Sequence, residues 1–137
     1  MATAWATRRG NKQTFRREVV RLRRDDLRDL VDEAARLLGP GATNLRLISE
    51  ADEKGERPAE SLLAWQSSVF PLQQRLRLRL PATSPVLRRY ADVRQALIEA
   101  AAAQDEAQRE TRLEEFEDTR DRFLDEARAA LEAPIKE

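Results

Sequence analysis

The chain has 137 residues, of which 41% are hydrophobic, 36% charged and 5% aromatic, and its 25 basic residues balance its 25 acidic ones. This length suits one small domain, and no apolar run is long enough to cross a bilayer, so we expect a single soluble domain. Because the sequence contains neither histidine nor cysteine, it excludes disulfides, thiolate metal sites and the commonest acid and base that work near neutral pH.

The residue types favour helices along the whole chain. Alanine, leucine, arginine and glutamate are abundant, and only four residues are glycine. These are helix formers rather than strand formers. We therefore predict an all-α fold, a small bundle of three to four helices with coiled-coil-like hairpin packing over residues 14–133. A flexible basic lead-in at 1–13 precedes this bundle, and a short tail at 134–137 follows it.

The first predicted helix starts at Thr14 and ends at the turn formed by residues 39–41. Its apolar side chains recur at the spacing that one helix face requires. They are Val20, Leu27, Leu30, Val31, Ala34, Leu37 and Leu38. Arg16 and Arg23 interrupt this face. The arginines therefore either extend to solvent from the edge of the core, or this half of the helix projects beyond the bundle toward a partner.

Residues 39–57 are rich in turn-forming and charged residues and predict a long connecting loop, with a short turn or an edge strand at 44–48. A second helix is predicted after Pro58. Its apolar residues are Leu62, Trp65, Val69, Leu72, Leu76 and Leu80. The alternating arginines and leucines of residues 75–80 would also suit a strand, and Pro71 removes a helical hydrogen bond. We favour a helix kinked at Pro71, because the apolar stripe continues through both segments.

The last third of the chain predicts one or two further helices after Pro85. A heptad-like seam is formed by Val86, Tyr90, Val93, Leu97, Ala100, Gln104 and Ala107. An apolar stripe then resumes out of phase at Leu113, Phe116, Phe123, Leu124, Ala127 and Leu131. A single helix over 86–132 would be about 70 Å long, so we expect a break between Gln104 and Arg112, or a partner chain over the overhang. A homodimer through this C-terminal seam is one such arrangement.

Charge is divided between the two parts of the chain. Residues 1–94 carry a net charge of +7 and residues 95–137 a net charge of −7, so the two parts should attract each other within one molecule or in an antiparallel dimer. Basic residues are densest over residues 8–24, where eight cations accompany only Glu18. We predict that these eight form the binding surface: Arg8, Arg9, Lys12, Arg16, Arg17, Arg21, Arg23 and Arg24. Such a cluster suits anionic lipid headgroups or the phosphates of nucleic acid.

The carboxylates offer a weaker alternative. Two sets have the helical spacing of Mg²⁺ ligands, namely Asp26, Asp29 and Glu33, and Glu114, Glu117, Asp118 and Asp121. Nearby arginines are ordinary salt-bridge partners for both sets. We therefore predict no catalytic residue, no metal site, no cofactor and no small-molecule substrate. Trp65 and Tyr90 are predicted core residues, and Trp5 belongs either to a tail or to an aromatic and basic flank beside a membrane.

The order of parts also points to a group of proteins. The matching features are the segment Thr7–Phe15, Arg23 with Leu27 or Leu30 in the helix that follows, and the later segment Leu76–Pro81. Over residues 7–35 and 70–100 the chain resembles a loose group of bacterial membrane-anchored proteins with a cytoplasmic arginine-rich helical domain. The resemblance implies a cytoplasmic location at the inner face of the membrane.

Three functional interpretations follow from these patterns. The leading one is a non-enzymatic, membrane-proximal interaction domain that docks a partner or an anionic surface through its basic first helix. The second is an accessory protein that uses the same arginines to bind the backbone of nucleic acid without reading its sequence. The third is a carboxylate-Mg²⁺ phosphohydrolase, which the candidate carboxylates support only by their spacing.

Overall fold

The computed structural model describes residues 23–133, and 82% of them are in helices. Helix 23–38 is followed by α2 (Gly41–Glu53), α3 (Glu60–Arg77), α4 (Pro85–Ala101) and α5 (Glu106–Glu132). The all-α prediction is confirmed. The predicted count of three to four helices is too low, because the described residues form five. The predicted lead-in at 1–13 and the tail at 134–137 lie outside these residues.

The additional helix is α2, which occupies most of the segment predicted as a loop at 39–57. The loop prediction is wrong. Residues 39 and 40 form a turn after helix 23–38, and the chain becomes helical again at Gly41. The Gly39 amide donates to the Ala35 carbonyl and the Asn44 amide donates to the Pro40 carbonyl, both at 3.0 Å. Proline is tolerated at the start of a helix, where its missing amide hydrogen needs no partner. Only residues 54–59 remain as a connection to α3.

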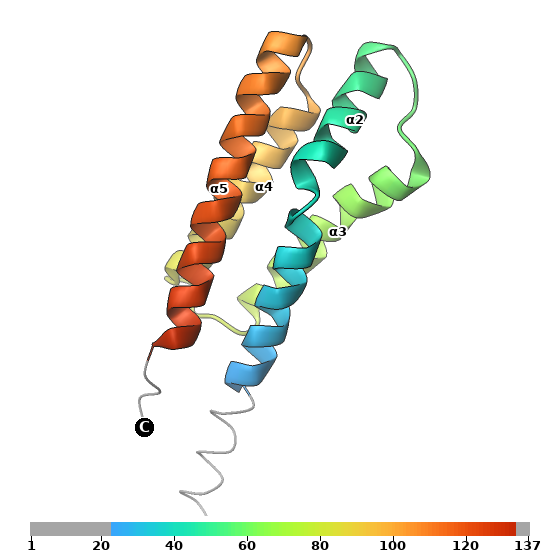
Figure 1. Ribbon diagram of the computed structural model, residues 1–137. Helices are drawn as coiled ribbons and strands as arrows, with labels where there is room; N and C mark the ends of the chain where they lie inside the picture. The colour runs from blue at the N-terminus through green and yellow to red at the C-terminus, as the bar shows by residue number, and fades with distance from the viewer. Residues whose placement is uncertain (1–22, 134–137) are drawn as a thin grey trace, which may run out of the picture.

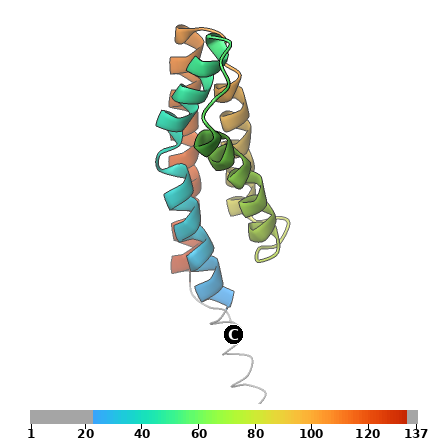
Figure 2. The ribbon, with the colours of Figure 1, turned by 90° about the vertical axis from the view of Figure 1, so that its right-hand side faces the viewer.

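The helices form an elongated bundle (Figures 1 and 2). Helix 23–38 and α2 follow each other along one side, and α5 runs antiparallel beside them. α4 and α5 form an antiparallel hairpin, and α3 crosses the bundle obliquely. The start of helix 23–38 and the end of α5 therefore lie at the same end of the molecule.

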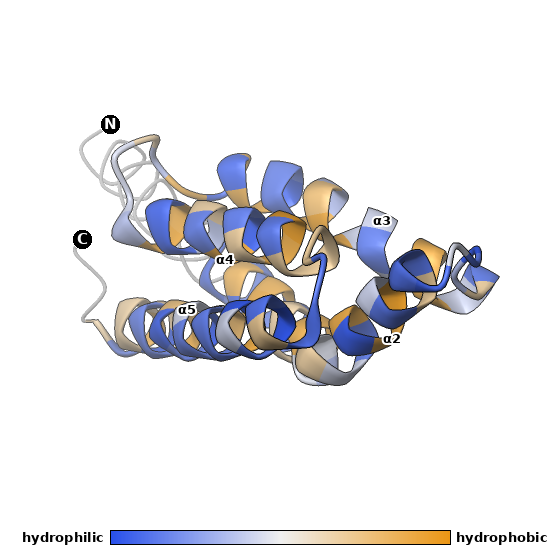
Figure 3. Cartoon of the chain, turned by 90° about the horizontal axis from the view of Figure 1, so that it is seen from above, coloured by the Kyte–Doolittle hydropathy of each residue, from blue (hydrophilic) through white to orange (hydrophobic). Residues whose placement is uncertain are grey.

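The predicted apolar stripes form the core. Viewed along the bundle, the hydrophobic sides of the helices face inward and the hydrophilic sides face outward (Figure 3). Phe116, Phe123 and Tyr90 are fully buried at its centre. The predicted α4 seam is buried from Val86 through Ala100, because α5 covers it within the same chain. A dimer through this seam remains a prediction, and it would compete with this internal packing.

The structure confirms the helical interpretation of the second apolar stripe. α3 continues through Pro71 to Arg77, and residues 78–80 form a turn rather than a strand. The helix therefore ends one turn earlier than the stripe suggests. The predicted break between the last two helices is found at residues 102–105, at the edge of the expected range. There the Asp105 carboxylate accepts a hydrogen bond from the backbone N–H of Gln108 at 2.7 Å, and this bond caps the start of α5.

Candidate functional site

Two of the eight predicted binding cations, Arg23 and Arg24, lie in the described part of the chain, and they differ in their exposure to solvent. Arg23 is exposed in the first described turn of helix 23–38, whereas Arg24 is half-buried. The Arg24 guanidinium donates to the carbonyls of Leu131 and Ala133, the second at 2.7 Å. The last carbonyls of a helix lack partners within the helix, and a cation there interacts favourably with the helix dipole. Arg24 therefore stabilises the end of α5.

The other six predicted cations precede the described helix in the chain. Arg8, Arg9, Lys12, Arg16, Arg17 and Arg21 lie outside the described residues. They come directly before the helix that begins beside the end of α5 (Figure 1). The basic segment of the sequence is thus connected to one end of the bundle rather than to its side.

The described bundle is acidic, although the whole chain is neutral. Residues 23–133 hold 18 basic and 23 acidic residues, a net charge of −5, while residues 1–22 hold six basic and one acidic residue, a net charge of +5. Even the described part of the first helix is not basic, since residues 23–38 contain four basic and five acidic side chains. The prediction of a basic first helix therefore applies only to the residues before Asp25.

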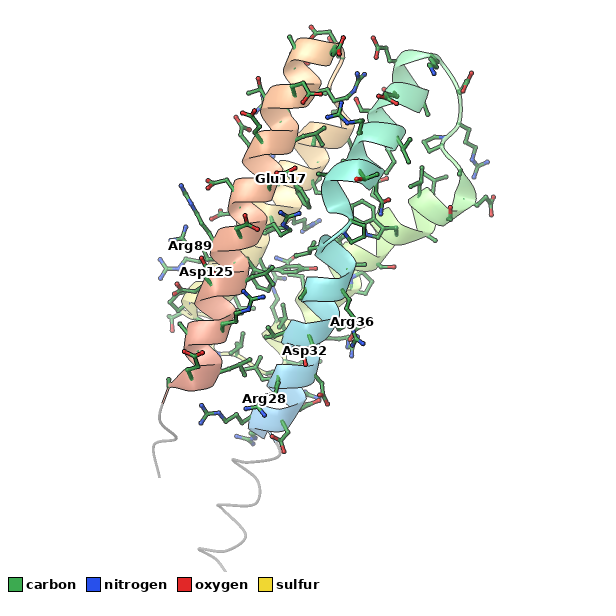
Figure 4. The ribbon with its side chains drawn as sticks, viewed as in Figure 1. Arg28, Asp32, Arg36, Arg89, Glu117 and Asp125 are labelled. Carbon is green, nitrogen blue, oxygen red and sulfur yellow. The ribbon has the colours of Figure 1, made fainter. Side chains whose placement is uncertain are left out.

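The net negative charge of the bundle lies on α5, which holds ten acidic and five basic residues. Six carboxylates recur every three or four residues along one exposed side of this helix: Glu106, Glu110, Glu114, Glu117, Asp121 and Asp125. Glu117 and Asp125 mark this side in Figure 4, and the mixed charges of Arg28, Asp32 and Arg36 mark the neighbouring helix. Helix 23–38 carries both signs of charge in nearly equal number, whereas this side of α5 carries an excess of negative charge, although Glu110 and Asp121 are paired with arginines.

Ion pairs connect neighbouring helices across the bundle. Arg75 on α3 pairs with Glu33 at 2.8 Å, and Arg79 just beyond α3 pairs with Asp26. The Arg46 guanidinium on α2 forms a hydrogen bond with Glu110 on α5 and holds the pKa of that carboxyl below its usual value. Among the described residues this is the single ion pair between a cation of residues 1–94 and a carboxylate of residues 95–137. The attraction predicted between the two oppositely charged parts therefore accounts for one ion pair within residues 23–133, while the six cations of residues 1–22 lie outside the described residues.

A buried polar cluster fixes α2 against the start of α5. The Arg109 side chain is 4% exposed; it donates to the Ser49 hydroxyl at 3.1 Å and pairs with Glu53. The Ser49 hydroxyl donates in turn to the Ala103 carbonyl at 3.1 Å. Every buried polar side-chain atom of the described residues has a partner, so this cluster stabilises the fold and has no unsatisfied group to offer a ligand.

Four of the seven candidate metal-binding carboxylates form ion pairs with arginines. On helix 23–38, Glu33 and Asp26 form the ion pairs with Arg75 and Arg79 described above. On α5, Asp118 pairs with Arg122 at 3.0 Å and Asp121 with Arg120 at 3.1 Å. Within residues 23–133 no three acidic side chains converge in a way that could hold a metal ion. Helical spacing alone therefore does not bring these carboxylates together into a metal site in the described part of the chain.

The predicted core aromatics have structural roles. Tyr90 is fully buried, and its hydroxyl donates to the Val69 carbonyl at 2.7 Å. Trp65 lies at the edge of the core, and its indole N–H donates to the Leu37 carbonyl at 2.7 Å. Trp5 is outside the described residues.

Several shallow grooves mark the surface of the bundle. One, with a volume of about 570 Å³, lies between helix 23–38 and α3. Another, of about 350 Å³, is lined by Pro85, Arg88, Arg89, Asp92 and Glu126. The charged side chains that line this second groove are two arginines and two carboxylates, so it presents no charge of a single sign to a ligand. The first groove borders a segment of α3, residues 61–74, that contains no charged residue. We did not anticipate this surface from the sequence, although the run without charge was a signal for it.

No protein-family description, curated protein or solved structure matches this chain. Among the described helices, none is both long enough and apolar enough to span a membrane. The functional assignment therefore depends on the charges and surfaces described above.

Proposed function

We propose that this protein is a non-enzymatic helical interaction domain that docks onto an anionic membrane surface through the basic residues before Asp25. The single observation that carries the proposal is the separation of charge, with +5 on residues 1–22 and −5 on residues 23–133. A membrane location at the cytoplasmic face agrees with the resemblance noted in the sequence.

Electrostatics gives this docking a direction. Each cation near an anionic bilayer contributes about 1 kcal/mol of attraction, which falls off over about 10 Å at 0.1 M salt. The acidic side of α5 is repelled by the same surface. Because helix 23–38 begins at one end of an elongated bundle (Figure 1), the molecule would stand with that end toward the membrane and its acidic bundle extending away.

The proposed contact set is smaller than the one predicted from sequence. Arg24 is occupied at the end of α5, so seven cations remain: Arg8, Arg9, Lys12, Arg16, Arg17, Arg21 and Arg23. Removing Arg24 would weaken the fold as well as the charge, and it is therefore excluded from the test.

Vesicle flotation tests the proposal with two variants of equal charge. The segment variant combines R8Q, R9Q, R16Q and R17Q. The bundle variant combines R28Q, R36Q, R77Q and R88Q, four exposed arginines that form no ion pair with another described residue. We expect wild type to float with anionic and not with neutral vesicles, the bundle variant to behave like wild type, and the segment variant to lose binding.

The same samples distinguish the membrane from nucleic acid. The nucleic-acid interpretation predicts binding to duplex DNA or RNA of any sequence, with an affinity that falls log-linearly with salt. Nucleic-acid binding without vesicle binding would replace our proposal with that alternative. Absence of binding to both would contradict the use of these cations for any anionic surface.

A further inference from the structure

The outward side of α3 carries no charge on an otherwise highly charged protein. Residues 61–74 contain no Asp, Glu, Lys or Arg, although 36% of the chain is charged. Ala64, Ser67, Ser68 and Pro71 are exposed along this stretch, whereas the Phe70 ring lies under the Arg94 guanidinium of α4, 4.4 Å from the ring centroid. Single exposed apolar residues are normal, but an uncharged helix side of about four turns indicates a surface that another chain covers.

The groove beside this surface is suited to packing rather than to a polar ligand. α3 contributes Ala64, Ser67, Ser68, Pro71 and Arg75 to its lining. The two serine hydroxyls donate to carbonyls one turn earlier in the same helix, at 2.6 and 2.8 Å. They therefore present small side chains with satisfied donors, and a second helix can approach closely over them.

The order of residues along α3 has a two-fold pattern. Three pairs are equidistant from the midpoint between residues 67 and 68: Glu60 with Arg75, Ala64 with Pro71, and Ser67 with Ser68. If a second α3 packs antiparallel about a two-fold axis at this midpoint, each member of a pair meets its counterpart on the other chain. Small or ring-shaped side chains then meet in the middle, and an acid meets a base at each end.

We propose that two copies of the chain associate through this α3 face, defined as Glu60, Ala64, Ser67, Ser68, Pro71 and Arg75, in an antiparallel two-fold dimer. This inference is independent of the membrane proposal, since it uses none of the N-terminal cations. It also uses a surface other than the predicted C-terminal seam, which the fold of one chain already buries.

The charges at the two ends of the α3 face are available for this pairing. The Glu60 side chain is 92% exposed, and Arg57 is 3.9 Å away. Arg75 holds Glu33 at 2.8 Å, yet its side chain is 53% exposed. A guanidinium has five N–H donors, so Arg75 can keep Glu33 and also bind Glu60 of the second copy. Each dimer would contain this ion pair twice.

Sedimentation equilibrium tests the dimer with a matched pair of substitutions. We expect wild type to have twice the chain mass of 15.7 kDa. S67E places a carboxylate from each copy beside the two-fold axis, where both are enclosed by the interface, and should weaken association by about 100-fold or more. T111E is the control, because Thr111 is also exposed on a helix and also donates to the carbonyl one turn earlier. We expect T111E to dimerise like wild type, and circular dichroism should show equal helix content for both variants.

A charge-reversal experiment tests the antiparallel register. One variant carries E60R, and the other combines R75E with E33R so that the ion pair inside the chain is kept with reversed signs. Each variant alone would place like charges at both ends of the interface, and should weaken its dimer by about tenfold or more. An equimolar mixture restores both attractive pairs, and we expect a mixed dimer.

Three results would overturn the proposal. They are a monomeric wild type at the highest attainable concentration, an S67E variant that dimerises as tightly as wild type, and no mixed dimer from the charge-reversed variants. Each result is separate from vesicle flotation, so either proposal can fail without the other.

Discussion

Tyr90 lies at the centre of the core, where its ring packs edge-on against Phe123 with ring centroids 5.1 Å apart. Burial is the main cause that raises the pKa of its hydroxyl, and the nearby negative charge of Glu33 adds to the shift. Because the neutral hydroxyl already donates to the Val69 carbonyl, ionisation would cost both solvation and a hydrogen bond. The folded state therefore holds this proton more tightly than the unfolded state does.

This shift has a defined effect on stability as pH rises. The contribution of Tyr90 is fully present below its unfolded pKa, near the ordinary value of 10.0, and is lost as pH rises toward the higher folded value. Since Tyr90 is the only tyrosine, phenolate absorbance reports on it alone. We expect the native chain to show no ionisation near pH 10 and the urea-unfolded chain to ionise there. Ordinary ionisation in the native chain, with helix content unchanged, would contradict the buried position.

Gly41 is required by the close approach of α2 to α5. A Cβ atom at this position would lie 2.4 Å from Cζ of Phe116, which is fully buried and has no free direction to move. We expect Gly41→Ala to lower the free energy of unfolding by roughly 1–3 kcal/mol, measured in urea. The penalty should shrink in a Phe116→Leu background, which removes the clashing ring atom. An equal penalty in both backgrounds would show that Phe116 is not the cause.

At the scale of the helices, Arg24 connects the first described turn to the last turn of α5. Arg24→Gln should cost about 0.5–1 kcal/mol, because the helix end loses a charged hydrogen-bond donor. Arg23→Gln removes the same charge from the neighbouring exposed position, and should leave stability unchanged. Hydrogen exchange should accelerate in the last turn of α5 in the first variant only. Equal exchange in both variants would contradict the cap.

The helices could be predicted where burial imposes a regular spacing. The stripes of α3, α4 and α5 appear in the sequence because each helix buries one side, and the alternation at residues 75–80 did not override that signal. The sequence does not predict α2, because the glycines and the proline at 39–41 indicate the end of a helix. In the structure Pro40 lies just before α2, where it costs no hydrogen bond.

The site could be predicted only in part, because several roles depend on contacts between distant residues. The cation density at residues 8–24 is visible in the sequence, but the hydrogen bonds from Arg24 to the end of α5 join residues more than 100 positions apart. The uncharged side of α3 was likewise visible as a run without charge. Its exposure became known only with the packing of the other helices, which leave that side of α3 uncovered.

At the scale of the whole molecule, charge is divided along the chain, with +5 on residues 1–22 and −5 on residues 23–133. The chain as a whole is neutral, so long-range attraction to an anionic surface depends on orientation rather than on net charge. This separation explains why the acidic side of α5 would not prevent docking through residues 8–23. It also predicts that docking weakens as salt screens the segment from the surface.

Equilibrium partitioning onto anionic vesicles at low salt, compared between the segment variant and the bundle variant, tests this account most directly. Both variants lose four arginines, from the N-terminal segment in one variant and from the described helices in the other. Four cations at about 1 kcal/mol each correspond to a decrease of roughly 1,000-fold in partition coefficient for the segment variant. We predict less than a tenfold decrease for the bundle variant, because its four arginines lie outside the basic segment that is proposed to dock. An equal decrease in both variants would contradict docking through the N-terminal segment.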